Sequence, residues 1–272
     1  MSYYKVLGLE KEPFSSSPDP QFFYRSASHH SALKRLEIAI RLRRGLCLIL
    51  GDIGTGKTTL SRALLQTFRD ENDFIFHMIL NPSYKSEYQF LLSLVKMFNI
   101  VPTFKSTLDF KEVLEKYLFQ KGVEENKTIV LLIDEGQKLT PENLEVLRTL
   151  LNYETNEYKL LQLVIMAQIE LLPRIKRIRN FMDRIVLKYT INPLDEIETK
   201  ELIEFRLKQA GYNNQNSLFT DEAIRFLYQH TQGYPRRIAL LCHDALETIV
   251  MKDRLVVDEE IINSLILQEA KL

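Results

Sequence analysis

Four residues near position 50 have the types and spacing of a phosphate-binding loop. Gly51, Gly56, Lys57 and Thr58 satisfy the pattern G-x-x-x-x-G-K-[ST], called Walker A. Glycines let backbone N–H groups close around phosphate oxygens, because no Cβ atom is in the way. We expect Lys57 to bind the β- and γ-phosphates of ATP and the Thr58 hydroxyl to bind Mg²⁺. The whole loop is expected to bind nucleotide: Gly51, Asp52, Ile53, Gly54, Thr55, Gly56, Lys57, Thr58 and Thr59.

Two carboxylates follow a second apolar run, at residues 129–133. An apolar run that ends in Asp134 and Glu135 has the form of a buried parallel strand with acids at its carboxyl end, the Walker B pattern. We expect Asp134 to hold Mg²⁺, and Glu135 to orient and deprotonate the attacking water. Two acids at a strand end are a weak signal alone, but a strong one downstream of Walker A.

Two further stretches carry polar groups that chemistry could use. Gln168 ends the apolar run 161–167 and is placed to sense the γ-phosphate, although a locally hydrogen-bonded loop glutamine is the alternative. The stretch 174–184 is strongly basic and suits either a subunit interface or DNA phosphates. Its only aromatic residue is Phe181, so it is poorly equipped for stacking on bases.

The remaining pattern predicts the elements that position these residues. Apolar runs predict five strands, at 46–50, 74–80, 129–133, 161–167 and 185–191, with helices between them. This alternation predicts an α/β three-layer sandwich around a five-stranded parallel sheet. From residue 193 only helices are predicted, at 196–209, 221–231, 235–251 and 258–267. We therefore expect a core at 1–192 and a small helical lid at 193–272.

The first 28 residues are rich in proline and aromatic residues, which argues against both long regular structure and disorder. We expect this segment to pack across the nucleotide-binding core, either as a structural strap or as part of an adenine pocket.

Composition limits the classes of protein to consider, although a net charge of zero does not exclude nucleic acid. Lys+Arg and Asp+Glu both number 36, so no overall basic field points to nucleic acid. Cys47 and Cys242 have neither a metal-ligand nor a redox spacing. No signal peptide and no apolar run of membrane-spanning length is visible. We expect a cytoplasmic protein without a membrane span.

The motifs together resemble a known family. GDIGTGKTT, LLIDEGQKL, Pro18-Asp19-Pro20 and Gly233-Tyr234-Pro235-Arg236 are similar to the AAA+ ATPases, and among them to the ATPase domain of the general secretion pathway protein A (ExeA) family. The resemblance implies a sensor 1 role for Gln168 and a sensor 2 role for Arg236, which reaches from the lid to the γ-phosphate. It also implies that Arg184 is an arginine finger offered to a neighbouring subunit.

The sequence departs from that family at a few positions. Gly136 stands where the family has alanine, and Ala167 and Ile169 stand where glycine and proline are usual. These changes leave the catalytic residues in place but alter the surroundings of sensor 1.

The expected function is that of an ATPase that hydrolyses ATP in a homo-oligomer, with nucleotide at the subunit interface and Mg²⁺ as cofactor. It would assemble or remodel a macromolecular complex, with a secretion or envelope assembly as the protein partner. The alternative is a DNA-associated ATPase similar to the TniB and TnsC transposition regulators. A scaffold that binds ATP without hydrolysing it is disfavoured, because the set of catalytic residues is complete.

Overall fold

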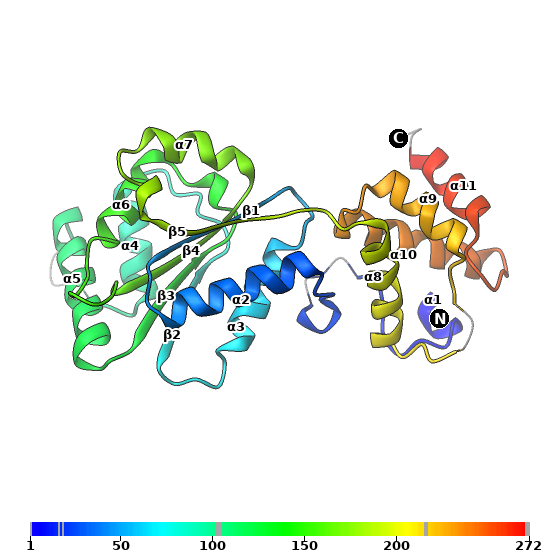
Figure 1. Cartoon of the computed structure of the whole chain (residues 1–272), viewed down its shortest axis with the longest axis horizontal. Helices are drawn as coiled ribbons and strands as arrows, with labels where there is room; N and C mark the ends of the chain where they lie inside the picture. Colours follow the sequence, from blue (N-terminus) through cyan, green and yellow to red (C-terminus); the bar gives the residue numbers. More distant parts are fainter. Residues whose placement is uncertain (1, 16, 18, 102–104, 215–216, 270–272) are drawn as a thin grey trace. The chain divides into compact units, whose positions relative to one another are not determined.

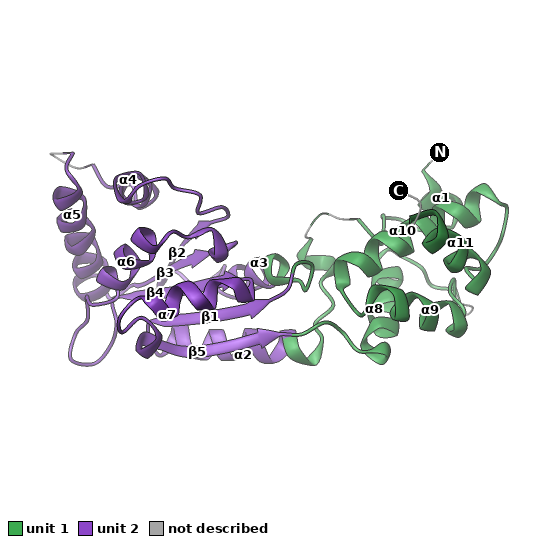
Figure 2. Cartoon of the chain, turned by 90° about the horizontal axis from the view of Figure 1, so that it is seen from above, with its two compact units in different colours: residues 1–28, 53–59, 192–272 green, residues 29–52, 60–191 purple. Residues whose placement is uncertain are grey.

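The computed structural model describes residues 2–15, 17, 19–101, 105–214 and 217–269. The chain forms two compact units, which Figure 2 distinguishes by colour. Unit 1 comprises residues 1–28, 53–59 and 192–272, and unit 2 comprises residues 29–52 and 60–191. The expected boundary near residue 193 coincides with the start of the last stretch of unit 1. The N-terminal segment, however, groups with the helices, and the division into 1–192 and 193–272 stays a prediction.

Unit 2 contains a parallel sheet of five strands in the order β2-β3-β4-β1-β5. The strands are β1 (Leu46–Gly51), β2 (Phe74–Ile79), β3 (Thr128–Ile133), β4 (Leu161–Ala167) and β5 (Ile185–Ile191). The three central strands are buried along their whole length, whereas β2 and β5 at the edges are partly exposed. Continuous apolar runs are what parallel strands need when helices cover both faces of the sheet.

Helices cover both faces of this sheet (Figure 1). They are α2 (Ala27–Arg41), α3 (Lys57–Thr67), α4 (Glu87–Met97), α5 (Thr107–Phe119), α6 (Pro141–Leu150) and α7 (Leu172–Arg177). Leu48, Leu131 and Leu163 point to the face where α4, α5, α6 and α7 close one hydrophobic core. The α2 and α3 helices lie on the other face (Figure 1). The predicted three-layer α/β sandwich is therefore confirmed.

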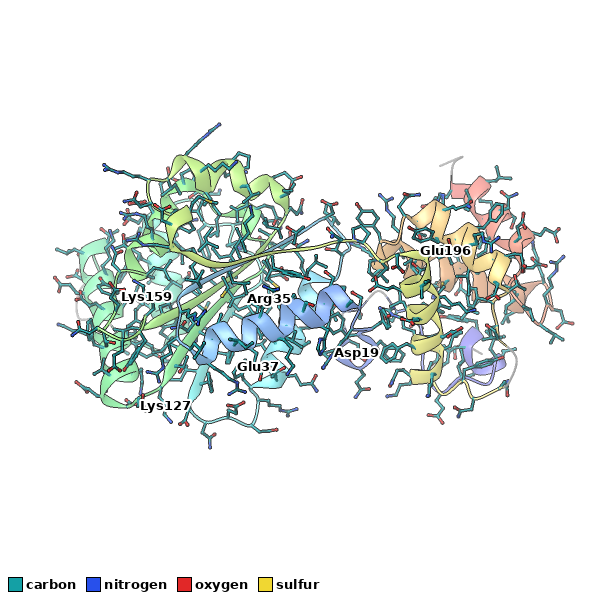
Figure 3. All side chains as sticks on the ribbon, in the orientation of Figure 1. Asp19, Arg35, Glu37, Lys127, Lys159 and Glu196 are labelled. Carbon is teal, nitrogen blue, oxygen red and sulfur yellow. The ribbon has the colours of Figure 1, made fainter. Side chains whose placement is uncertain are left out.

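Helix α2 buries Leu33, Leu36 and Ile40, and its charged side chains, two of which Figure 3 labels, make further contacts. The guanidinium of Arg35 lies 5.7 Å from the centre of the Tyr189 ring, within the range of a cation–π contact. Arg41 forms salt bridges with Glu37 and Glu71. The helix ends at Arg41, and Leu42 beyond its end is exposed.

The regular structure of unit 1 is mainly helical, and the stretch 53–59 contributes a loop and the first residues of α3 to it. Its helices are α1 (Tyr3–Val6), the first residues of α2, α8 (Glu196–Gln209), α9 (Asp221–Thr231), α10 (Pro235–Met251) and α11 (Glu259–Glu269). The bounds of α8, α9 and α10 are those that the sequence predicts. None of the helices in the described part of the chain is long and apolar enough to cross a membrane.

The N-terminal segment packs with these helices. Leu9, Phe14 and Phe22 are buried in the same hydrophobic cluster as α8 and α10. The hydroxyl of Tyr24 donates a hydrogen bond to Glu201 on α8. The apolar faces of the late helices therefore bury these side chains within unit 1, and the expectation that the segment packs across the nucleotide-binding core stays a prediction.

Candidate nucleotide-binding site

The carboxyl edge of the sheet gathers the expected chemical groups of unit 2. Leu50 is level with Ala167 across β1 and β4, and Ile165 is level with Ile133 across β4 and β3. The residues that follow these strands, Asp52, Asp134 and Gln168, therefore emerge at one edge. Ligands of open α/β sheets bind at this edge.

The loop between β1 and α3 has the backbone shape that its sequence pattern requires. Gly54 and Gly56 have φ angles of +84° and +93°, where other residues are strained. Thr55 is fully buried, and Lys57 is only 7% exposed to solvent. The lysine side chain therefore lies inside the protein, at the first residue of α3, where the positive end of the helix dipole favours an anion.

The N-terminus of α10 lies against this loop, within unit 1. The backbone N–H of Arg236 donates a hydrogen bond to the carbonyl oxygen of Gly54 at 3.2 Å. A Cβ atom on Gly54 would lie 3.0 Å from the Cβ of Arg236. The neighbouring Arg237 instead stacks on the ring of Tyr234, 5.0 Å from its centre. Of the two arginines in the first turn of α10, Arg236 is thus the one brought to the loop.

The aspartate of the expected Walker B pattern is a buried carboxylate. Asp134 is 2% exposed, and its Oδ1 accepts a hydrogen bond from the backbone N–H of Glu135 at 2.9 Å. Its own N–H donates to the carbonyl of Ile79 at 2.8 Å, which fixes it to the end of β2. A buried carboxylate and the Thr58 hydroxyl are hard oxygen donors, so the residue types fit Mg²⁺. The glycine loop and Lys57 likewise fit the phosphates of a nucleotide.

Glu135 adopts an unusual backbone conformation for a residue with a side chain, with φ at 53° and ψ at 35°. Its side chain is 37% exposed, and its Oε2 accepts a hydrogen bond from Nε2 of Gln137 at 2.8 Å. Strained residues of this kind gather at functional sites. Glu135 is therefore a solvent-accessible carboxylate held in one place, as a general base must be.

The departure from the family at Gly136 has a steric reason in this chain. A Cβ atom at position 136 would lie 2.5 Å from Cγ2 of Ile165 and 3.2 Å from the carbonyl oxygen of Met166. Alanine would therefore displace β4 or the turn that carries Glu135.

Gln168 lies where the sequence predicts, directly after β4. Its backbone N–H donates to Oε1 of Gln137 at 3.1 Å. This bond fixes the start of the turn after β4, and both interpretations of the Gln168 side chain, a γ-phosphate sensor or a loop glutamine, stay open.

Arg184 lies at the opposite edge of the sheet. It precedes Ile185 at the amino end of β5, whereas Gly51 is level with Ile191 at the other end. Six residue steps along a strand span about 20 Å, so the guanidinium cannot reach the carboxyl edge of its own sheet. It binds the side chain of Asn152 and the carbonyl of Asn180.

Three residues in these networks were not predicted from the sequence: Gln137, Asn152 and Arg174. Arg174 belongs to the basic run, but its Nη1 donates to the carbonyl oxygens of Gln137 at 2.5 Å and Leu139 at 3.1 Å. The residues in these bonds lie more than 30 positions apart, so local periodicity carries no signal for them.

The chain is similar to several known proteins. The family model described as AAA domain matches residues 40–175. General secretion pathway protein A from Aeromonas hydrophila is 36% identical over 246 residues, which are 90% of this chain and 44% of that protein. The chain therefore spans less than half of this relative.

Solved structures of the same fold have low sequence identity. They include the Drosophila ORC bound to DNA (TM-score 0.70, 19% identity, 97% of this chain and 65% of that one) and the Aeropyrum pernix ORC2 protein (TM-score 0.63, 15% identity, 88% and 66%). The Thermotoga maritima RuvB branch migration motor is also similar (TM-score 0.56, 14% identity, 86% and 67%). At these identities the likeness concerns the fold alone.

Proposed function

Because this chain belongs to the AAA ATPase family, we propose that it binds ATP with Mg²⁺ and hydrolyses it as an oligomer. The observation that carries the proposal is the arrangement around β1. A Walker A loop leaves the carboxyl end of this strand, and Asp134 and Glu135 follow β3 at the same edge of the sheet.

Each residue has a part in the proposed reaction. Lys57 and the loop N–H groups bind the phosphates, while Thr58 and Asp134 hold Mg²⁺, which supplies charge stabilisation when bound. Glu135 orients the attacking water and accepts its proton. Arg236 reaches the γ-phosphate from the N-terminus of α10, in keeping with its contact to Gly54.

The position of Arg184 supports an oligomer. A cation about 20 Å along β5 from the carboxyl edge has no use at its own nucleotide. At a subunit interface it would face the γ-phosphate of a neighbour. A positioned arginine there increases the rate of hydrolysis by a factor of about 10³–10⁵.

The test is ATP hydrolysis measured together with molecular mass in solution, with and without ATP. We expect Mg²⁺-dependent turnover that rises more than linearly with protein concentration, and a larger particle when ATP is present. A monomer that turns over at a rate independent of concentration would contradict the oligomer, and absence of turnover would contradict the ATPase.

For the biological role, we propose that the ATPase assembles or remodels a macromolecular complex in the cytoplasm or at the cell envelope. Support comes from the 36% identity to general secretion pathway protein A, which extends over 90% of this chain. Co-purification of the protein with its genomic neighbours, compared between the wild type and Glu135→Gln, tests this role. A partner retained only by the hydrolysis-deficient variant is the expected result.

DNA is a second candidate partner, favoured by one group of cations. Lys176, Arg177 and Arg179 are exposed around the end of α7, in contrast to Arg174, whose guanidinium is bonded to the turn after β3. If these cations bind DNA phosphates, duplex DNA should stimulate hydrolysis, with a steep loss of stimulation as salt rises. Turnover that DNA does not change would exclude this role.

A further inference from the structure

We propose that Gln137 is a positioning residue for the hydrolysis reaction. Its side-chain amide holds the carboxylate of Glu135 and ties it to the end of β4 at Gln168. This inference rests on the proposed ATPase function, and the experiment below separates the two.

The side-chain amide of Gln137 bridges one group that can only accept hydrogen bonds and one that can only donate a hydrogen bond. Its Nε2 donates to Oε2 of Glu135 at 2.8 Å, and its Oε1 accepts from the backbone N–H of Gln168 at 3.1 Å. A carboxylate can only accept and a backbone N–H can only donate, so the amide has one workable orientation. The reversed amide would place oxygen against oxygen and N–H against N–H. The pair of bonds therefore defines a rigid link between Glu135 and Gln168.

The carboxylate needs such a link because little else holds it. Glu135 has left-handed backbone angles and a side chain that is 37% exposed, and a free glutamate of this kind samples several rotamers. The ammonium of Lys138 lies 3.8 Å from the same Oε2, at the end of a long and exposed chain. It supplies charge but no orientation. The Gln137 bond takes one lone pair of one oxygen and leaves the other oxygen to accept a proton from water.

The backbone of Gln137 is itself fixed by hydrogen bonds from Arg174. It lies in a short 3₁₀ turn, Gly136–Lys138, and Nη1 of Arg174 donates to its carbonyl oxygen and to that of Leu139. The turn cannot move without breaking these bonds. A residue anchored by its backbone, with both ends of its amide engaged, can set the position of a neighbouring carboxylate to a fraction of an ångström.

The Gln137 amide also joins two residues that have expected roles in the reaction. Gln168 is the residue predicted to sense the γ-phosphate, and Glu135 is the predicted base. A shift of the backbone at Gln168 is passed to the carboxylate through two hydrogen bonds and one planar amide.

Two substitutions separate positioning of the base from support of the fold. Gln137→Ala removes both bonds of the amide. Gln137→Glu keeps an oxygen for the N–H of Gln168 but replaces the donor with a charge that repels Glu135. We expect kcat to fall at least about tenfold in both variants, because a displaced base loses much of its rate advantage. Nucleotide affinity and the KM for ATP should stay within about twofold, because the two hydrogen bonds of the amide go to Glu135 and Gln168 and not to residues expected to bind phosphate through the loop.

The matched control is Gln120→Ala, at an exposed glutamine of unit 2, which should turn over at the wild-type rate. Wild-type turnover in Gln137→Glu would overturn the proposal, because it would leave only a structural bond to Gln168. Faster turnover in either variant would overturn it as well.

A double variant and a direct spectroscopic readout complete the test. If Gln137 acts through Glu135, adding Gln137→Ala to Glu135→Gln should produce no further loss of rate.

In the nucleotide-free protein labelled with ¹⁵N-glutamine, the side-chain amide signal of Gln137 is the one that disappears in Gln137→Ala. That signal should shift in Glu135→Ala. An unchanged signal, or fully additive rate losses, overturns the proposal. If the wild type hydrolyses no ATP, the proposed function fails, and the amide signal alone then decides whether Gln137 binds Glu135.

Discussion

The guanidinium of Arg184 donates a hydrogen bond from Nη2 to Oδ1 of Asn152, at the amino edge of the sheet. Its Nη1 donates to the carbonyl oxygen of Asn180 at 3.2 Å. Its Nε is buried, and no partner for it is found in the described part of the chain. Arginine has five N–H donors in a planar fork, so these contacts orient the group and leave donors for an anion. Asn152 thereby holds Arg184 in the place from which it would serve a neighbouring subunit.

The first prediction tests this placement by mixing two inactive proteins. Arg184→Ala should bind ATP almost normally but fail to complete a neighbour's site. Lys57→Ala should leave its own nucleotide site empty but retain Arg184. Mixed oligomers then contain some interfaces with both parts intact, so ATPase activity should reappear to a fraction of the wild-type rate. The measurement is hydrolysis after confirmed subunit exchange.

Arg179→Ala is the control for that experiment, because Arg179 is an exposed arginine of the same basic stretch. It should hydrolyse ATP at the wild-type rate without DNA. No recovery in the mixture despite exchange, or full activity of Arg184→Ala alone, would contradict the assignment of Arg184 as the arginine finger. Arg179 and Arg177 would then be the next candidates.

The second prediction concerns the buried lysine of the loop. Lys57→Ala removes the charge that faces two phosphates, and charge-assisted hydrogen bonds contribute about 1.5–3 kcal/mol each. Affinity for a fluorescent ATP analogue should fall by about tenfold to a hundredfold or more. Wild-type affinity in this variant would show that the loop does not bind phosphate.

The third prediction separates binding from chemistry. Glu135→Gln preserves the shape of the side chain but cannot accept a proton, so hydrolysis should slow by about a hundredfold or more while ATP affinity is retained. Single-turnover hydrolysis of radiolabelled ATP measures the first quantity, and equilibrium titration the second. Turnover close to the wild-type rate would move the catalytic base to another residue.

Much of the fold could be predicted from local signals. The strands β4 and β5 have the predicted bounds, and polar residues mark three of their four ends: Gln168 follows β4, and Arg184 and Asn192 flank β5. The helices α8 and α9 begin at N-caps, where Asp195 and Thr220 accept the expected backbone bonds, and α10 begins at Pro235. Caps and apolar runs are properties of neighbouring residues, so one sequence suffices to read them.

The remainder depends on contacts between distant residues. The burial of Phe14 and Phe22 is decided by which apolar faces the late helices leave open, and no local pattern records this. Among the expected site residues, the contiguous motifs were readable from sequence. The bonds from Gln137 to Gln168 and from Arg184 to Asn152 span 31 and 32 positions and form only when the strands pair.

The fourth prediction uses two glycines of unit 1 with almost the same φ angle. A Cβ atom on Gly233 (φ +72°) would lie 1.8 Å from the carbonyl oxygen of Leu194, whereas one on Gly8 (φ +74°) would meet nothing within 4 Å. Gly8→Ala should lower the free energy of unfolding by about 1–2 kcal/mol, the strain of the left-handed conformation alone. Gly233→Ala should lower it by more than about 4 kcal/mol or prevent folding, because the backbone must also move.

Urea unfolding followed by circular dichroism measures both free energies. Equal losses in the two alanine variants would contradict the close approach of Gly233 and Leu194.

The last prediction concerns acid stability and His77 on β2. The imidazole stacks on Phe98 with 4.3 Å between ring centres, and its Nε2 is buried with no partner in the described part of the chain. Burial disfavours the charged form and lowers the pKa of His77 from 6.5 to about 4. Between these two values the unfolded chain binds a proton that the folded chain does not. Stability should therefore fall as the pH drops from about 6.5 to 4, and this contribution should be constant above pH 7.

His77→Phe keeps an aromatic ring against Phe98 and cannot be protonated, so it isolates this contribution. The free energy of unfolding, from urea titrations at intervals between pH 7.5 and 4, should fall by about 1–3 kcal/mol more in the wild type than in the variant, after allowance for solvent reaching part of the ring. Other groups that titrate in this range affect both proteins alike, so the difference between the two curves belongs to His77. Parallel curves across the whole range would show that the imidazole is protonated as readily in the folded chain as in the unfolded one.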